Sequence, residues 1–134
     1  MYEYEGIKIH WLGHDAFWIE AKGKNIYIDP YKLGKSNLPS ADIIITSHEH
    51  FDHCNAEAIN ILSSENTTLV GPRICQEILN TQITKKHEVL ELNPDEHLDL
   101  DVVKVTAIAA YNTHRFRDPE TQTPFHPKSS GHIG

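Results

Sequence analysis

The sequence predicts a single α/β domain, and three observations carry this prediction. The chain has 134 residues, which is enough for one domain and too short for two. The run Ile43 to Ile45, inside residues 42–46, is typical of a strand that is buried on both faces. After this run, strand-like and helix-like segments alternate along the chain, which is the pattern of an α/β fold.

The first third of the chain predicts short strands joined by tight turns. Apolar and polar residues alternate over residues 7–11, and residues 17–21 and 25–28 form two more short apolar runs. Pro30 ends the third run, because proline donates no hydrogen bond to a sheet. We expect the buried strand over residues 42–46 to lie in the middle of this sheet.

The rest of the chain predicts two helices, further strands and a long loop. Asn55 is placed to cap the first helix, and Pro72 to occupy the first position of the second. The sheet is expected to grow again through strands at residues 67–70, 88–92, 96–100 and 102–109. Residues 112–134 are polar and without periodicity, so they predict a loop.

Composition and charge exclude several classes of protein. Hydrophobic residues make up 39% and charged residues 23%, which is an ordinary globular mixture. The 12 Lys and Arg against 19 Asp and Glu give a net charge of −7, so a general nucleic-acid binder is not expected. With two cysteines, no apolar leader and no run near the ~20 apolar residues of a membrane helix, we expect a cytoplasmic protein without a membrane anchor.

Candidate metal ligands crowd into one segment, residues 47–53, directly after the predicted buried strand. Open α/β sheets place their sites at the carboxyl ends of strands. Alternate side chains of an extended backbone share a face, so His48 and His50 can bind one ion, while Asp52 and His53 reach a neighbouring position. Imidazole suits zinc and also manganese, iron, cobalt or nickel, so the ligand type leaves the metal open.

The segment HEHFDH resembles the His-x-His-x-Asp-His signature of the metallo-β-lactamase superfamily. Residues 11–17, 25–30 and 41–47 are similar to the branch that contains the ascorbate-phosphate lactonases and related metal-dependent hydrolases. The resemblance implies an αββα sandwich, a mixed β-sheet with flanking helices. It implies that residues 1–134 form a single but incomplete domain, the amino-terminal portion of that fold. One or two divalent ions are implied, zinc first, with manganese, iron or nickel as the other candidates.

The resemblance also assigns roles to individual residues. The implied metal ligands are His48, His50, Asp52, His53 and His126. His126 is the best match for the third ligand of the first ion, and His114 is the alternative. Asp52 is the candidate catalytic residue that orients or deprotonates the attacking water. His14, Asp29 and His114 are candidates for contact with the substrate or for support of a ligand histidine.

The expected function is metal-assisted hydrolysis of a small lactone or phosphate ester. Arg115, Arg117 and Lys128 in the predicted loop either bind an anionic substrate or are simply solvated. The family's second half supplies a bridging aspartate and a further histidine, so only the first metal site is expected to be complete here. The alternative is a truncated metal-binding chain without activity of its own, or one that needs a partner to complete the second site. An exposed sheet face would then favour self-association.

Overall fold

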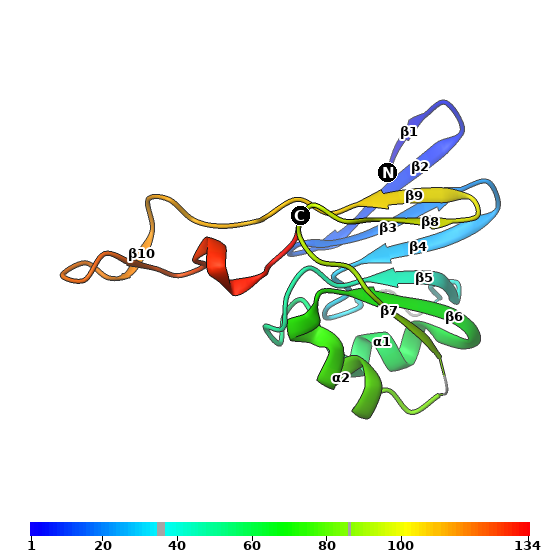
Figure 1. The fold of residues 1–134 in the computed structure, drawn as a ribbon. Coiled ribbons are helices and arrows are strands. Elements are labelled where there is room, and N and C mark those ends of the chain that lie inside the picture. Colours follow the sequence, from blue (N-terminus) through cyan, green and yellow to red (C-terminus); the bar gives the residue numbers. More distant parts are fainter. Residues whose placement is uncertain (35–36, 86) are drawn as a thin grey trace.

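A seven-stranded mixed sheet organises the computed structural model, which describes residues 1–34, 37–85 and 87–134 (Figure 1). Its strands are β1 (Tyr2–Tyr4), β2 (Ile7–Gly13), β3 (Ala16–Ala21), β4 (Lys24–Ile28), β5 (Ala41–Ile45), β6 (Ser63–Gly71) and β7 (Glu88–Glu91). They lie side by side in chain order; β1 to β4 are antiparallel, and β4 to β7 are parallel. Strand β5 therefore has parallel neighbours on both sides, which confirms its predicted central position.

The two faces of this sheet are covered by different elements (Figure 1). Helices α1 (Ala56–Leu62) and α2 (Gln76–Thr81) cover one face, where Ile44 packs in a cluster with Ile59 and Leu79. The hairpin of β8 (His97–Leu100) and β9 (Val103–Thr106) covers the other, where Ile43 packs in a cluster with Leu98. Neighbouring residues of one strand thus serve opposite layers, as the pleat requires. The layering of helices, sheet and second sheet matches the predicted metallo-β-lactamase-like sandwich.

The first predicted helix begins where expected, and the second does not. The side chain of Asn55 accepts a hydrogen bond from the backbone N–H of Ala58 at 2.9 Å, which caps α1. Pro72 is extended, with ψ of 167°, and precedes a short 3₁₀ turn, η1 (Arg73–Cys75); α2 begins only at Gln76. The fixed φ of proline suits both conformations, so its position alone did not locate the start of the helix. None of the helices in the described ranges has the length and apolar character needed to cross a membrane.

Four strands differ from the prediction: one was missed, and three differ in extent or placement. Strand β1 was not predicted, and β6 begins at Ser63 rather than at residue 67, because Ser63 already pairs with Ala41 of β5. Strands β8 and β9 do not extend the main sheet; they pair with each other. The turn that follows β7 lifts the chain onto the face of the sheet, where the backbone N–H of Asp95 donates to the carbonyl of Ala107.

The predicted loop over residues 112–134 contains regular structure. It holds a two-stranded ribbon of β10 (Phe116–Asp118) and β11 (Thr123–Pro124), followed by the 3₁₀ turn η2 (Lys128–Ser130). Figure 1 shows this segment as an arm that leaves the sheets and returns to them. At its return, Ile133 bridges to Ala109, and its backbone N–H donates to the carbonyl of Ser47 at 3.0 Å. The arm therefore ends against the segment that follows β5.

Gly71 supplies the first testable prediction, on stability. A Cβ at this position would lie 2.5 Å from Oγ1 of Thr46 and 3.1 Å from Cδ1 of Leu79, both in the interior. Gly71→Ala is therefore expected to lower the free energy of unfolding by about 1–3 kcal/mol through overpacking. Urea unfolding measures the effect against Gly34→Ala, whose Cβ would meet no described atom within 4 Å. Equal stability of the two variants would contradict the prediction.

Candidate metal centre

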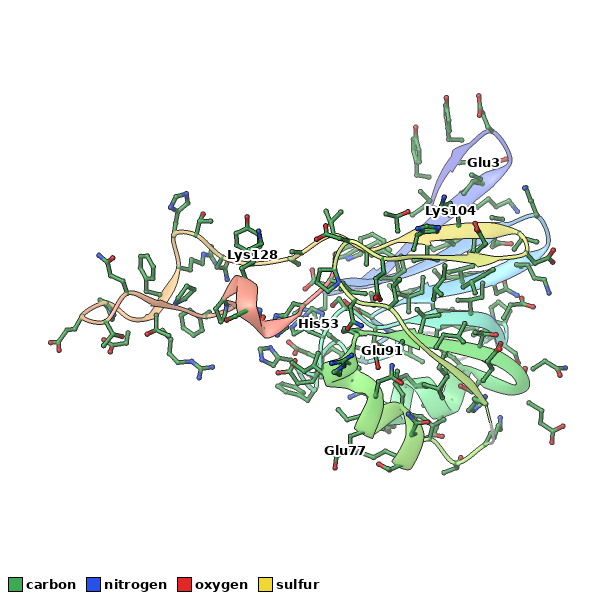
Figure 2. All side chains as sticks on the ribbon, in the orientation of Figure 1. Glu3, His53, Glu77, Glu91, Lys104 and Lys128 are labelled. Carbon is green, nitrogen blue, oxygen red and sulfur yellow. The ribbon has the colours of Figure 1, made fainter. Side chains whose placement is uncertain are left out.

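The His-rich segment lies at the carboxyl edge of β5, and tight backbone hydrogen bonds hold it there. The backbone N–H of Thr46 still donates to Val70 in β6, which keeps the chain extended as it leaves the strand. The backbone N–H groups of His53 and Cys54 then both donate to the carbonyl of His50 at 2.9 Å. This turn brings His53 back beside the start of the segment. His53 is labelled in Figure 2, at the edge of the sheet from which the arm departs.

Three histidines form the first group of metal donors: His48, His50 and His126. One ring nitrogen from each lies within 4.8 Å of the others, and Nε2 of His48 is 3.1 Å from Nδ1 of His50. A tetrahedral ion with bonds of about 2.0–2.1 Å keeps its donor atoms roughly 3.3 Å apart, so this spacing fits one shared ion. The backbone N–H of Asn112 donates to the carbonyl of His126 at 2.8 Å, which fixes where the arm presents this ring.

The two candidates for the third histidine are separated by the structure. His126 joins His48 and His50, with ring centroids 5.3 Å and 5.1 Å away. His114 is exposed on the arm and belongs to neither donor group found among the described residues. The imidazole that lies near His48 and His50 is therefore that of His126 and not that of His114.

A second group of donors lies beside the first. One donor atom each from His14, Asp15 and His53 lies within 4.8 Å of the others. Asp52 adjoins this group, with Oδ2 at 3.0 Å from Nε2 of His14 and Oδ1 at 4.0 Å from Nε2 of His53. The sequence predicted Asp52 and His53 as a pair here; the turn between β2 and β3 adds one imidazole and one carboxylate.

The backbone conformation of the β2–β3 turn explains how His14 reaches this group. His14 has a φ of 51°, in the left-handed region that residues with a side chain rarely adopt, and Gly13 before it has a φ of 109°. Nε1 of Trp11 donates to the carbonyl of His14 at 2.8 Å, which stabilises the tight turn. The conformation costs free energy and aims the imidazole at Asp52.

Asp29 orients one histidine of each donor group, His53 directly and His48 through Ser47. Its carboxylate, almost fully buried, accepts hydrogen bonds from Nδ1 of His53 at 2.8 Å and from the backbone N–H of Ser47 at 2.7 Å. The hydroxyl of Ser47 also donates to Asp29 and lies 2.9 Å from Nδ1 of His48. In His48 and His53, Nδ1 therefore carries the proton and donates to an oxygen, so Nε2 has the free lone pair. Support of this kind fixes the tautomer of a metal-binding histidine.

The electrostatics of the cluster favour the uncharged imidazoles that bind metals. Burial, followed by repulsion from the neighbouring histidines, lowers the pKa of His48 to about 3. Burial also lowers the pKa of His126, again with help from nearby histidines. For Asp52, burial alone would raise the pKa, but a backbone N–H and the rings of His53 and His14 outweigh it and hold the pKa below its ordinary value. At neutral pH the rings of His48 and His126 are therefore uncharged, and the carboxylate of Asp52 is ionised.

Three residues at the site carry no prediction from the sequence: Asp15, Glu49 and His132. Asp15 follows His14 in the same turn, so its only signal in the sequence was that it adjoins a candidate site residue. Glu49 lies inside the HEHFDH segment. His132 is only 5% exposed and stacks on His48, with ring centroids 4.6 Å apart. Its position in the sequence, beyond the arm, gave no signal that it packs there.

A hollow of about 320 Å³ opens beside the first donor group. Its lining includes His48, His126 and His132, together with Tyr111 and Asn112. A reacting group held there would lie against the imidazoles.

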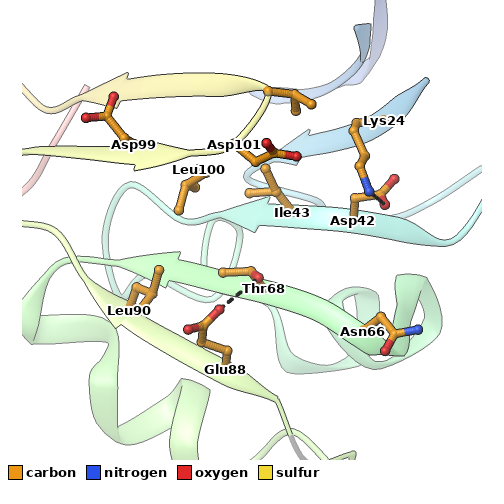
Figure 3. A pocket seen from close by; sticks show the side chains of 11 residues that line it. Lys24, Asp42, Ile43, Asn66, Thr68, Glu88, Leu90, Asp99, Leu100 and Asp101 are labelled. Atoms are coloured by element: carbon orange, nitrogen blue, oxygen red, sulfur yellow. Dashed lines mark hydrogen bonds and ion pairs between the residues drawn. The ribbon is translucent and has the colours of Figure 1, made fainter. Parts of the chain in front are cut away.

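Another hollow, of about 400 Å³, lies at the opposite edge of the sheet, where β5 and β7 begin (Figure 3). It is lined by several carboxylates, but two of them are already engaged. Asp42 accepts from Nζ of Lys24 at 2.9 Å, and Glu88 accepts from Oγ1 of Thr68 at 3.3 Å. This edge carries neither of the two donor groups.

Comparison with known proteins gives consistent matches. A family model described as a beta-lactamase superfamily domain matches residues 8–130. A UPF0173 metal-dependent hydrolase of Methanopyrus kandleri is 28% identical over 113 residues, covering 80% of this chain and 48% of that protein. A UPF0173 protein of Pyrococcus abyssi is 29% identical over 120 residues, with shares of 88% and 52%. A crystal structure from Parabacteroides distasonis has a TM-score of 0.67 at 27% identity, covering 81% of this chain and 47% of that one. The chain spans about half the length of the curated relatives that it matches.

Proposed function

The chain belongs to the metallo-β-lactamase superfamily, and from this premise we propose that it serves as a metal-dependent hydrolase of small esters, with zinc as the preferred ion. One observation carries the proposal: His48, His50 and His126 converge from distant parts of the chain on one point beside an open hollow. Three imidazoles with a free position for substrate are the typical ligand set of a catalytic zinc site. The relatives described as metal-dependent hydrolases support the same class.

The donor groups fit one or two divalent ions. His48, His50 and His126 would hold the first, and His53 and Asp52, with His14 and Asp15, would hold the second. When bound, such an ion polarises the ester oxygen and lowers the pKa of water toward neutrality. Four donors beside the first site give the second ion more support than the Asp52 and His53 pair predicted from the sequence.

Asp52 is placed to handle the proton of the attacking water. Its lowered pKa keeps it ionised at neutral pH, and its side chain is 26% exposed, so water can reach it. With an ion in the first site alone, Nε2–H of His14 donates to Oδ2 at 3.0 Å, which leaves Oδ1 to accept a proton. An oriented carboxylate of this kind acts as a general base.

The preferred substrates are phosphate esters or lactones with an anionic group. Support comes from Lys128, whose Nζ lies 5.5 Å from the ring centroid of Tyr111 at the hollow. A positive charge at the entrance raises the local concentration of anionic substrates. Arg117 packs on Phe125 farther along the arm, 5.9 Å from its ring centroid, and adds to the same charge.

The test is a hydrolysis panel with the protein loaded with Zn²⁺. Bis(p-nitrophenyl) phosphate, p-nitrophenyl phosphate and γ-butyrolactone separate phosphodiesterase, phosphomonoesterase and lactonase activity. Turnover that disappears with EDTA and returns with Zn²⁺ would support the proposal. Bound zinc without turnover of any substrate would favour the alternative, in which this chain binds metal but needs further protein to complete the enzyme.

Asp52→Asn supplies the second testable prediction. The amide keeps the size of the carboxylate but accepts no proton, so kcat is expected to fall by about 10²–10⁴-fold on the best substrate of the panel. The first metal site should stay occupied, because Asp52 is not among its donors. Steady-state kinetics and elemental analysis measure both quantities. Full turnover with unchanged metal content would remove Asp52 from the chemistry.

A further inference from the structure

His132 is buried at the metal centre without being one of the three grouped donors. Its ring lies flat against His48, with an interplanar angle of 26°. Its backbone is pinned on both sides: the carbonyl accepts from the N–H of Ala110 at 3.0 Å, and the next N–H, of Ile133, donates to Ser47. A polar ring held this firmly in a buried position needs partners for its nitrogens.

The two nitrogens of His132 face two different groups. Nδ1 is 3.1 Å from Nδ1 of His126, and Nε2 is 3.4 Å from Oε2 of Glu49. That oxygen of Glu49 is buried and has no hydrogen bond within the part of the chain that the structure describes. The other oxygen, Oε1, lies 3.9 Å from Nε2 of His50. The Glu49 carboxylate therefore sits between two histidines and needs a donor.

Two other histidines of the site show how a partner at Nδ1 determines which nitrogen can bind an ion. His48 and His53 each have Nδ1 next to an oxygen, from Ser47 and Asp29, which leaves Nε2 for an ion. For His126 the corresponding partner is another histidine, so its tautomer depends on where the proton of His132 lies. The ionised carboxylate of Glu49 faces Nε2 of His132 and can only accept a hydrogen bond. It therefore favours the tautomer of His132 that has its proton on Nε2.

We propose that Glu49 and His132 form a positioning pair for the third metal ligand. In this pair Nε2 of His132 carries a proton and faces Oε2 of Glu49 at 3.4 Å, and Nδ1 of His132 accepts from Nδ1–H of His126 at 3.1 Å. Nε2 of His126 is then the nitrogen that binds the ion. The effect of the pair on metal affinity rests on the proposed function. The position of the ring proton of His126 in the metal-free protein does not depend on it.

The first test reads the proton directly. In protein labelled with ¹⁵N-histidine, long-range ¹H–¹⁵N correlation spectra assign the tautomer of each ring, first without metal and then with Zn²⁺. We expect His126 to carry its proton on Nδ1 and His132 on Nε2 in both states. A proton on Nε2 of metal-free His126 would overturn the pair.

The second test measures metal affinity by competition of Co²⁺ with a chromophoric chelator. His132→Phe keeps the stacking ring but removes the acceptor, and a lost partner of a ligand histidine weakens metal binding by about 10–100-fold. His132→Asn keeps an oxygen near the position of Nδ1, so its affinity should stay close to wild type. His97→Asn, at an exposed position of β8, serves as the matched control and should change nothing.

The outcomes separate the two proposals. Wild-type affinity in His132→Phe would overturn the positioning pair, and so would an affinity of His132→Asn as low as that of His132→Phe, which would make His132 itself a ligand. If His132→Phe does not fold, the tautomer of wild-type His126 and the affinity of His132→Asn decide. A wild-type protein that binds no Co²⁺ or Zn²⁺ would overturn the proposed function, while the tautomer of metal-free His126 would still decide the pair.

Discussion

Replacing His50 with alanine is expected to strip the tightly bound ion from the protein. Three imidazoles converge on the first site, and Nδ1 of His50 is 3.1 Å from the donor of His48, so its loss leaves two ligands. Two ligands hold a divalent ion poorly, and metal affinity should fall by at least about 10²-fold. Elemental analysis of untagged protein, wild type against His50→Ala, measures the effect.

The same measurement discriminates between the two histidines of the arm. His126→Ala should lose metal in the same way as His50→Ala, whereas His114→Ala should retain it, because His114 is exposed and outside both donor groups. The His114 variant is also a matched control for removing an imidazole from the arm. Retention of the ion by His50→Ala would show that the first group does not hold it.

Acid is expected to destabilise the metal-free protein, and His48 should account for much of the loss. Its pKa is about 3 in the folded state, against an ordinary value of 6.5, because the ring is buried among other histidines. As the pH falls from 6.5 toward 3, the unfolded chain takes up a proton that the folded chain resists, so stability is lost on acidification. By pH 4.5 the loss from His48 alone is on the order of 3 kcal/mol.

Urea unfolding in the presence of EDTA, at intervals from pH 7 to pH 4.5, measures this loss. His126 and His132 add to it in the same direction, because the pKa of each is also lowered by burial. His48→Phe, which cannot titrate, should show a clearly flatter dependence on pH than wild type. Equal slopes for the two proteins would show that protonation of His48 does not oppose folding.

The features that the sequence predicted well are local ones. The run before Thr46 is apolar on both faces, so its burial could be read from composition, and the structure places it as β5 at the centre of the sheet. Asn55 caps α1 through its own side chain, which depends on a neighbour three residues away. His48 and His50 lie close together because they are two residues apart, although the chain bends at residues 48–50 and is not extended there.

The features that escaped prediction depend on contacts between distant parts of the chain. His132 meets Glu49 across 83 residues, the difference between their numbers, and nothing near either residue marks the contact. His14 reaches Asp52 only because the β2–β3 turn adopts a left-handed conformation. The short strands of the arm pair only with each other, and their residues lack the alternation that identifies a strand.

The hydrogen bonds at the base of the arm make the position of the His126 imidazole independent of the ribbon beyond it. Both ends of the arm are tied down, by the hydrogen bonds from Asn112 to His126 and from Ala110 to His132. The intervening ribbon can change in length or sequence without moving the imidazole that follows it, since extending a surface loop costs little free energy. Residues 113–125 can therefore vary as an interchangeable module of the fold, while the position of the His126 imidazole is inherited unchanged.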